Sequence, residues 1–232
     1  MNIEIWSDVV CPWCYIGKRR FEKALHQFDG SKQVQIRWRS FELDPGAPRS
    51  IEKDMASRLS EKYRISEQQA RESMVHITSV AQAEGLDYRL DEAKMTNSFD
   101  AHRLIQMASG IGLGSQMKER LLRAYFVESE DISNKDALLR FASEVGLPPD
   151  EVSELLSSDA LADQVRADES LARELGITGV PFFVFDCKYA VSGAQPSEVF
   201  LEVLARVRAE QSVQNLADGD DANVCGDDGC QI

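Results

Sequence analysis

The sequence predicts an α/β fold in which a long helical segment interrupts a small sheet. Strand-like stretches rich in β-branched and aromatic residues occur near the start of the 232-residue chain, at 3–10 and 34–38, and again at 180–191. Between about 50 and 175, apolar side chains recur almost only at helical spacing. The chain therefore divides into a mixed first part, a helical middle part and a mixed last part.

The first forty residues predict a strand, a helix and a second strand. The helix follows the Cys11-Pro12-Trp13-Cys14 segment, and its apolar side chains recur at helical spacing, at Phe21, Ala24, Leu25 and Phe28. From 34 to 38 apolar and polar residues alternate, which is typical of a half-buried strand. A strand–helix–strand order of this length predicts a parallel βαβ unit.

The middle part predicts a bundle of helices without an internal repeat, which excludes a solenoid. The expected helices lie at about 51–63, 67–84, 98–109 and 115–126, then after a capping box of Ser133 with Asp136, and finally from Asp150 and from Asp159 to Leu175.

The last part predicts a hairpin and a helix. A strand at 182–185 turns at 186–188 into a second strand at 189–191, and a helix begins near Pro196. Beyond about residue 212 the chain contains five Asp and no Lys or Arg, so we expect a flexible acidic tail.

Strand–helix–strand followed, after the insertion, by helix–strand–strand–helix is the order of a thioredoxin fold with a large all-helical insertion. We expect residues 1–44 and 164–211 to form the thioredoxin-like domain, 45–163 the inserted helical domain, and 212–232 the tail.

The Cys11-Pro12-Trp13-Cys14 motif carries the chemistry. Pro12 suits the first turn of a helix, which places Cys11 at the helix N-terminus, where the dipole favours a thiolate. We therefore expect the pKa of Cys11 to be lowered. The indole of Trp13 is neutral, so the helix N-terminus must account for most of this lowering. Cys14 lies within one turn and can attack a mixed disulfide on Cys11.

Composition and residue spacing argue against a metal site, against nucleic-acid or membrane partners and against a membrane span. A zinc site needs two more ligands, which no nearby His or Cys pair supplies, so no metal and no cofactor is predicted. With 26 Lys plus Arg against 39 Asp plus Glu, a net charge of −13 argues against nucleic acid and anionic membranes as partners. No apolar run approaches the roughly 20 residues that span a bilayer, and no secretory leader is recognisable. We expect a cytoplasmic protein, in which a Cys pair is more often catalytic than structural.

Five segments resemble those of the DsbA-like superfamily, specifically its FrnE-like cytoplasmic branch, over residues 2–210. They are SDVVCPWCYIG at 7–17, WRSFELDP at 38–45, NSFDAHRL at 97–104, GVPFFVF at 179–185 and VSGAQ at 191–195. The resemblance implies a protein disulfide oxidoreductase or isomerase with a role in oxidative stress defence. In it Cys11 would be the nucleophile, and Cys14 would resolve the mixed disulfide. Disulfide-containing proteins or peptides would be its substrates, and glutathione or a thioredoxin-type protein its reductant.

The resemblance also implies roles for residues outside the motif. Pro181 matches the position that forms a cis peptide bond facing the active site, which would leave the backbone of Val180 free to pair with substrate. Asp8 is a candidate proton acceptor for Cys14, although such a residue is more often a solvated or capping group. Asp8, Asn97 and His102 are candidates for a substrate groove.

Two further interpretations concern the other cysteines. The tail pair Cys225 and Cys230 is flanked by glycines, and we expect it to exchange disulfides with the Cys11–Cys14 pair as an accessory redox centre. Weak metal binding and no role at all are the alternatives for this pair. Cys187, at the hairpin turn, is interpreted as structurally incidental, with oxidation or dimer cross-linking as the minor alternative.

Two other functions stay open at this point. One is the glutathione-dependent isomerisation of small molecules by related hydroxychromene-carboxylate isomerases, against which the second cysteine, Cys14, argues. The other is a peptide-binding chaperone module that uses the helical insertion as its holding surface.

Overall fold

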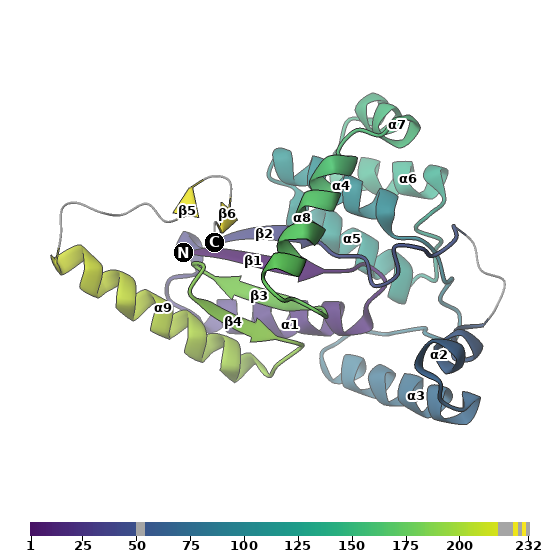
Figure 1. Ribbon diagram of the computed structural model, residues 1–232, viewed down its shortest axis with the longest axis horizontal. Helices are drawn as coiled ribbons and strands as arrows, with labels where there is room; N and C mark the ends of the chain where they lie inside the picture. Colours follow the sequence, from purple (N-terminus) through teal and green to yellow (C-terminus); the bar gives the residue numbers. More distant parts are fainter. Residues whose placement is uncertain (50–53, 218–224, 227–228, 231–232) are drawn as a thin grey trace.

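A single mixed sheet joins the two ends of the chain (Figure 1). The structure, a computed structural model, describes the backbone of residues 1–49, 54–217, 225–226 and 229–230, with side chains as far as residue 211. The sheet has the order β2-β1-β3-β4, formed by β1 (Asn2–Ser7), β2 (Gln35–Ser40), β3 (Phe182–Phe185) and β4 (Tyr189–Ser192). β1 is parallel to β2 and antiparallel to β3, which is antiparallel to β4. Strands from the first and last parts of the chain therefore pair directly.

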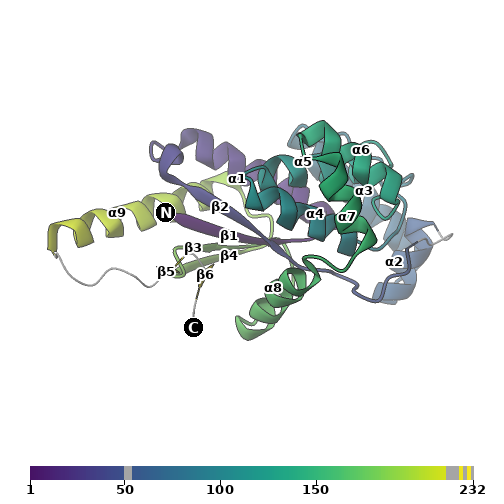
Figure 2. The ribbon, with the colours of Figure 1, turned by 90° about the horizontal axis from the view of Figure 1, so that it is seen from above.

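Helices cover both faces of this sheet (Figure 2). On one face lie α1 (Pro12–Gln27) and α9 (Ser197–Ala217), and on the other lies α8 (Ala162–Glu174). The period-two alternation of β1 explains the layering, because Ile3 and Ile5 join the main core beneath α1 while Trp6 packs toward α8. The indole Nε1 of Trp6 donates to the carbonyl of Asp168 in α8 at 3.0 Å.

The helical insertion lies at one end of the sheet (Figure 1). It consists of α2 (Met55–Tyr63), α3 (Glu67–Ala83), α4 (Phe99–Gly110), α5 (Gly114–Phe126), α6 (Lys135–Val145) and α7 (Pro149–Ser157), and a short 3-10 turn (Ser31–Gln33) precedes β2. α4 and α5 pack against each other and against β2, so the insertion is anchored to the sheet. The predicted thioredoxin fold with an all-helical insertion is confirmed.

The starts of α6 and α2 differ from the sequence prediction or lie beyond its test. Ser133 does not cap α6, because its hydroxyl donates to the carbonyl of Arg49 at 2.6 Å. The side chain of Asn134 accepts instead from the N–H groups of Asp136 and Ala137, so the predicted capping box is wrong by one residue. The expected start of the second helix near 51 lies outside the described residues, which resume at Asp54, the N-cap of α2.

Past α9 the described backbone includes two short strands, β5 (Cys225–Gly226) and β6 (Gly229–Cys230), which pair antiparallel with Cys225 opposite Cys230. In the described part of the chain, no helix is both long and apolar enough to cross a membrane.

Candidate functional site

The two cysteines of the motif sit at the start of α1, at the end of the sheet nearest the insertion. Cys11 is the N-cap of α1 with extended backbone angles, Pro12 follows at the first helical position, and the N–H of Cys14 donates to the carbonyl of Cys11 at 3.0 Å. Both are free thiols, and they are 3% and 1% exposed respectively. The site is thus a buried dithiol, and it lies at the helix N-terminus where the sequence predicts it.

The loop before β3 supplies the second wall of the site. The Val180–Pro181 peptide bond is cis, the geometry predicted for it, and the Sγ of Cys11 donates to the carbonyl of Val180 at 3.4 Å. Gly17 of α1 permits this contact, because a Cβ atom there would lie only 2.9 Å from Cγ of Pro181. The glycine therefore lets the helix approach the proline ring closely.

The pKa of Cys11 is shifted in the direction opposite to the prediction. The hydrogen bond with Cys14, together with burial, raises the pKa of Cys11 well above its usual value. Burial raises the pKa of Cys14 as well, but the hydrogen bond from Cys11, the charge of Lys118 and the hydroxyl of Ser7 outweigh it and lower this pKa overall. The expectation of a lowered pKa at Cys11 is wrong, because the neighbouring sulfur of Cys14 and burial favour the protonated thiol there, whereas the pKa that is lowered is that of Cys14.

Asp8 and His102, named separately from the sequence, lie together beneath the dithiol. Both are fully buried, and Nε2 of His102 is 3.2 Å from Oδ1 of Asp8. The other oxygen of Asp8 accepts from the N–H of Leu43 at 2.7 Å, and Oδ1 also accepts from the N–H of Val10 at 3.4 Å. Burial raises the pKa of Asp8, but the partners, His102 above all, lower it overall. A carboxylate so occupied is a poor proton acceptor for Cys14.

Lys118 of α5 reaches the same site from the insertion. Lys118 is 1% exposed, and its Nζ donates to the carbonyl of Ser7 at 3.1 Å. The same Nζ lies 5.6 Å from the centre of the Trp38 ring. Burial lowers the pKa of Lys118 to about 8, even though the negative charges of Cys14 and Asp8 raise it.

Tyr88 fixes the backbone of the motif. Its hydroxyl donates to the carbonyl of Pro12 at 2.7 Å, and its ring stacks on Phe126 at 4.8 Å between centroids. Burial raises the pKa of Tyr88, so the hydroxyl remains protonated and can serve as this donor. Trp13, between the two cysteines, is half-buried against the main core.

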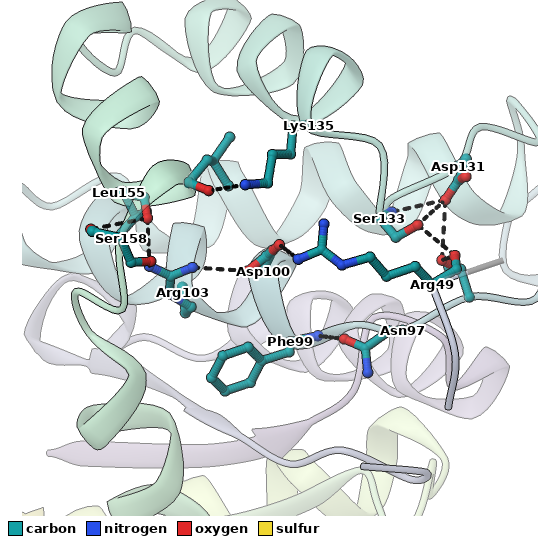
Figure 3. Close-up of polar contacts among 12 residues, drawn as sticks. Arg49, Asn97, Phe99, Asp100, Arg103, Asp131, Ser133, Lys135, Leu155 and Ser158 are labelled. Atoms are coloured by element: carbon teal, nitrogen blue, oxygen red, sulfur yellow. Dashed lines mark hydrogen bonds and ion pairs between the residues drawn. The ribbon is translucent and has the colours of Figure 1, made fainter. Parts of the chain in front are cut away.

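The side chain of Asn97 bonds to the backbone just before α4 (Figure 3). Its Oδ1 accepts from the N–H of Phe99 at 2.9 Å, and its Nδ2 donates to the carbonyl of Ala47 at 3.1 Å, so it connects the start of α4 to the segment after β2. In the same region Asp100 joins Arg49 to Arg103. Asn97 holds structure here, and the predicted groove role stays a prediction.

The remaining cysteines lie elsewhere. Cys187 is disulfide-bonded, so its interpretation as incidental is wrong. It forms the β3–β4 turn with Asp186, and both residues have positive φ, of 54° and 45°. The side chains of Cys225 and Cys230 lie outside those that the structure describes. Among the residues that it does describe, no three His, Cys, Asp or Glu side chains gather in a way that could hold a metal ion.

Sequence reasoning missed three residues of the site, Lys118, Tyr88 and Ser7. A signal existed for Lys118, which lies four and seven residues before the buried Leu122 and Tyr125 and therefore on the apolar stripe of its helix. Tyr88 lies in an irregular segment and Ser7 at a strand end, where the sequence carries no comparable signal.

The fold and the buried dithiol beside a cis-proline define a protein of the thioredoxin-fold, paired-cysteine class. The family model described as DSBA-like thioredoxin domain matches residues 2–205, and the chain belongs to this family.

Individual relatives agree with this assignment. A probable DsbA oxidoreductase from Streptomyces coelicolor is 41% identical, with a TM-score of 0.88, over 100% of this chain and 99% of that one. The uncharacterized protein YwbO of Bacillus subtilis is 27% identical over 207 residues, which is 88% of this chain and 96% of that protein. The cytosolic disulfide reductase DsbM from Pseudomonas aeruginosa, solved with GSH, shares the fold at 20% identity and a TM-score of 0.62, over 93% and 100% of the two chains.

Proposed function

We propose that this protein is a thiol–disulfide oxidoreductase that reduces or isomerises disulfides in proteins or peptides. The observation that carries the proposal is the free Cys11–Cys14 dithiol at the start of α1, with the Sγ of Cys11 against the carbonyl of Val180. A dithiol of this kind needs no cofactor, because its own two sulfurs supply the two electrons of reduction.

In the first step Cys11 attacks the substrate. Its thiol, which donates to the carbonyl of Val180 in the resting state, loses its proton to water. The Cys11 thiolate then attacks one sulfur of the substrate disulfide, so that a mixed disulfide forms and the substrate S–S bond breaks. The second substrate sulfur leaves as a thiolate and takes up a proton from water.

In the second step Cys14 resolves the mixed disulfide. Cys14 loses its proton to water, and its thiolate attacks Sγ of Cys11. The Cys11–Cys14 bond forms, the bond to the substrate breaks, and the remaining substrate sulfur leaves as a thiolate that is protonated by water. The substrate has gained two electrons and the enzyme pair has lost them, so an external thiol such as glutathione must restore the dithiol.

The position of Val180 supports a peptide as substrate. A segment that pairs with the backbone beside the cis-proline places its disulfide next to Cys11, in the manner of strand addition. The cytoplasm remains the predicted compartment, and its reducing poise favours reduction or isomerisation over net oxidation.

Reduction of insulin by glutathione, measured with catalytic amounts of the protein, tests the proposal. We expect Cys11→Ser to abolish catalysis, and Cys14→Ser to accumulate a mixed disulfide with insulin at Cys11 that mass spectrometry detects. Catalysis by Cys11→Ser equal to that of the wild-type protein would refute the proposal.

We further propose an accessory redox role for Cys225 and Cys230. The pairing of their backbones across β5 and β6 supports an approach of the two residues to each other. Removal of residues 212–232 is expected to slow recovery of the reduced Cys11–Cys14 pair after a single turnover. Unchanged recovery would contradict this role.

A further inference from the structure

The ammonium of Lys118 is buried without a carboxylate partner in the described part of the chain. Its hydrogen bond there goes to the carbonyl of Ser7, and its other polar neighbour is the face of the Trp38 ring. Asp8, the nearby carboxylate, directs its oxygens to His102 and to backbone N–H groups. Burying a charge costs free energy unless an opposite charge lies nearby, so an anion close to Lys118 would stabilise its ammonium.

A second buried group near Cys14 is also incomplete. The hydroxyl of Ser7 is fully buried and has no hydrogen-bond partner of ordinary geometry within the described residues. It lies close enough to Cys14 to lower the pKa of that thiol, and the backbone N–H of Asp8 acts in the same direction. The hydroxyl of Ser7, which lacks an acceptor, and the ammonium of Lys118, which lacks a carboxylate partner, therefore both lie near the sulfur of Cys14.

The groups around this sulfur come from four elements. β1 and the turn after it contribute Ser7 and Asp8. Cys11 lies at the N-cap of α1, and Lys18 lies within α1, where its charge lowers the pKa of Lys118. α4 contributes His102 through Asp8, α5 contributes Lys118, and Tyr88 donates to the carbonyl of Pro12 in the motif. Of these, Lys118 is the cation that acts directly to lower the pKa of Cys14.

We propose that Lys118 and Ser7 are positioning residues that hold the sulfur of Cys14 as a thiolate and so set the rate of the resolving step. The helical insertion thus supplies the counter-charge for the dithiol of the sheet domain. The inference rests on the proposed function and assigns its second step. In that step the Cys14 thiolate forms the bond to Cys11, the substrate thiolate leaves, and water protonates it.

Single-turnover oxidation by dithiobis(nitrobenzoate) separates the two steps. Attack by Cys11 releases the first nitrobenzoate thiol at a rate proportional to reagent concentration, and attack by Cys14 releases the second at a rate independent of it. Because Cys11 is blocked in the mixed disulfide, the pH profile of the second phase reports the ionisation of Cys14 by itself.

We expect Lys118→Met to slow the second phase at least about tenfold at neutral pH and to move its pH midpoint upward. Ser7→Ala should slow it about two- to tenfold. The second phase of Lys118→Arg, which keeps the positive charge, should be faster than that of Lys118→Met. The control is Lys135→Met, which alters an exposed lysine of the same insertion that donates to the carbonyl of Leu156.

The outcomes distinguish the two proposals. Absence of a first phase in the wild-type protein would remove the proposed function itself. A normal wild-type reaction with the same second-phase pH profile in folded Lys118→Met would overturn the role of Lys118 alone. If Lys118→Met fails to fold, the pH profile of Ser7→Ala decides, and an unshifted midpoint there would overturn the inference.

Discussion

At the scale of single residues, Asp8 shows how a position near the reacting sulfurs can be structural. Its two oxygens are occupied by His102, Leu43 and Val10, and none is directed by a hydrogen bond to either thiol. Its negative charge raises the pKa of Cys11. Asp8 therefore opposes thiolate formation while it holds the end of β1 to the start of α4.

This view predicts the behaviour of Asp8→Asn. We expect the free energy of unfolding to fall by about 1–3 kcal/mol, because a buried charge-assisted hydrogen bond with His102 is lost. The second phase of single-turnover oxidation should be no slower than in the wild-type protein. Denaturant unfolding and stopped-flow absorbance measure the two effects, with exposed Asp29→Asn as control. A slower second phase with unchanged stability would restore Asp8 as proton acceptor.

The residue scale also shows what the sequence can reveal of the site. Cys11, Cys14 and Pro181 could be predicted because their roles depend on local order and on a family resemblance. The acidity of the thiols could not, because it depends on Lys118, which comes from a different helix. A lysine on an apolar stripe is compatible with a side chain that extends its amine to solvent, so the sequence does not reveal its burial.

At the scale of elements, α8 is held to the sheet by a buried charge network. Arg39 of β2 donates to Glu4 of β1 at 2.7 Å and to Asp168 of α8 at 2.7 Å. Asp168 also accepts from the N–H of Ser40 at 2.8 Å and from Gln106 at 2.6 Å. One guanidinium thus joins two strands and a helix.

Arg39→Met would leave two buried carboxylates without this cation. We expect the free energy of unfolding to fall by about 3–5 kcal/mol, since removal of one partner leaves uncompensated buried charge. Arg173→Met, at an exposed position of α8, is the control. Chemical denaturation monitored by tryptophan fluorescence measures both, and a loss below about 1 kcal/mol in Arg39→Met would contradict this account.

Element boundaries illustrate a limit of sequence reasoning. The existence and type of the helices follow from the spacing of apolar residues, whereas the start of α6 depends on which of two adjacent polar residues turns inward. Ser133 and Asn134 are both good N-caps. Asn134 is the N-cap because the hydroxyl of Ser133 donates instead to the carbonyl of Arg49, which is distant in the sequence. The local sequence carries no information about that contact.

At the scale of the whole molecule, Glu119 couples the insertion to the sheet domain. This residue of α5 accepts from Tyr15 at 2.6 Å and from Lys18 at 2.6 Å, and it also pairs with Arg19, all three in α1. Burial raises the pKa of Glu119, but these partners, Arg19 first, lower it from 4.5 to about 2. The coupling is therefore expected to depend on pH.

The direction of the pH dependence of stability follows from the shift in the pKa of Glu119. Because the pKa of Glu119 is lower in the folded state, its stabilising contribution is complete above about pH 4.5 and is lost as the pH falls toward about 2. We expect wild-type protein to be more stable than Glu119→Gln at neutral pH, with a difference that shrinks across this window. Thermal unfolding at several pH values measures it, with exposed Glu72→Gln as control. A difference that stays constant down to pH 2 would argue against the coupling.

The convergence of distant segments on the dithiol has a consequence for how the protein is made. Cys11 and Cys14 are synthesised before their partners, because Lys118 follows 111 positions after Ser7, and Val180 follows 169 positions after Cys11. A nascent chain that emerges from the ribosome therefore exposes an ordinary pair of thiols long before their surroundings exist. The special acidity of the pair arises only after Lys118 and Val180 have been synthesised and have folded around it, so a chain that stops short of them carries the motif without this acidity.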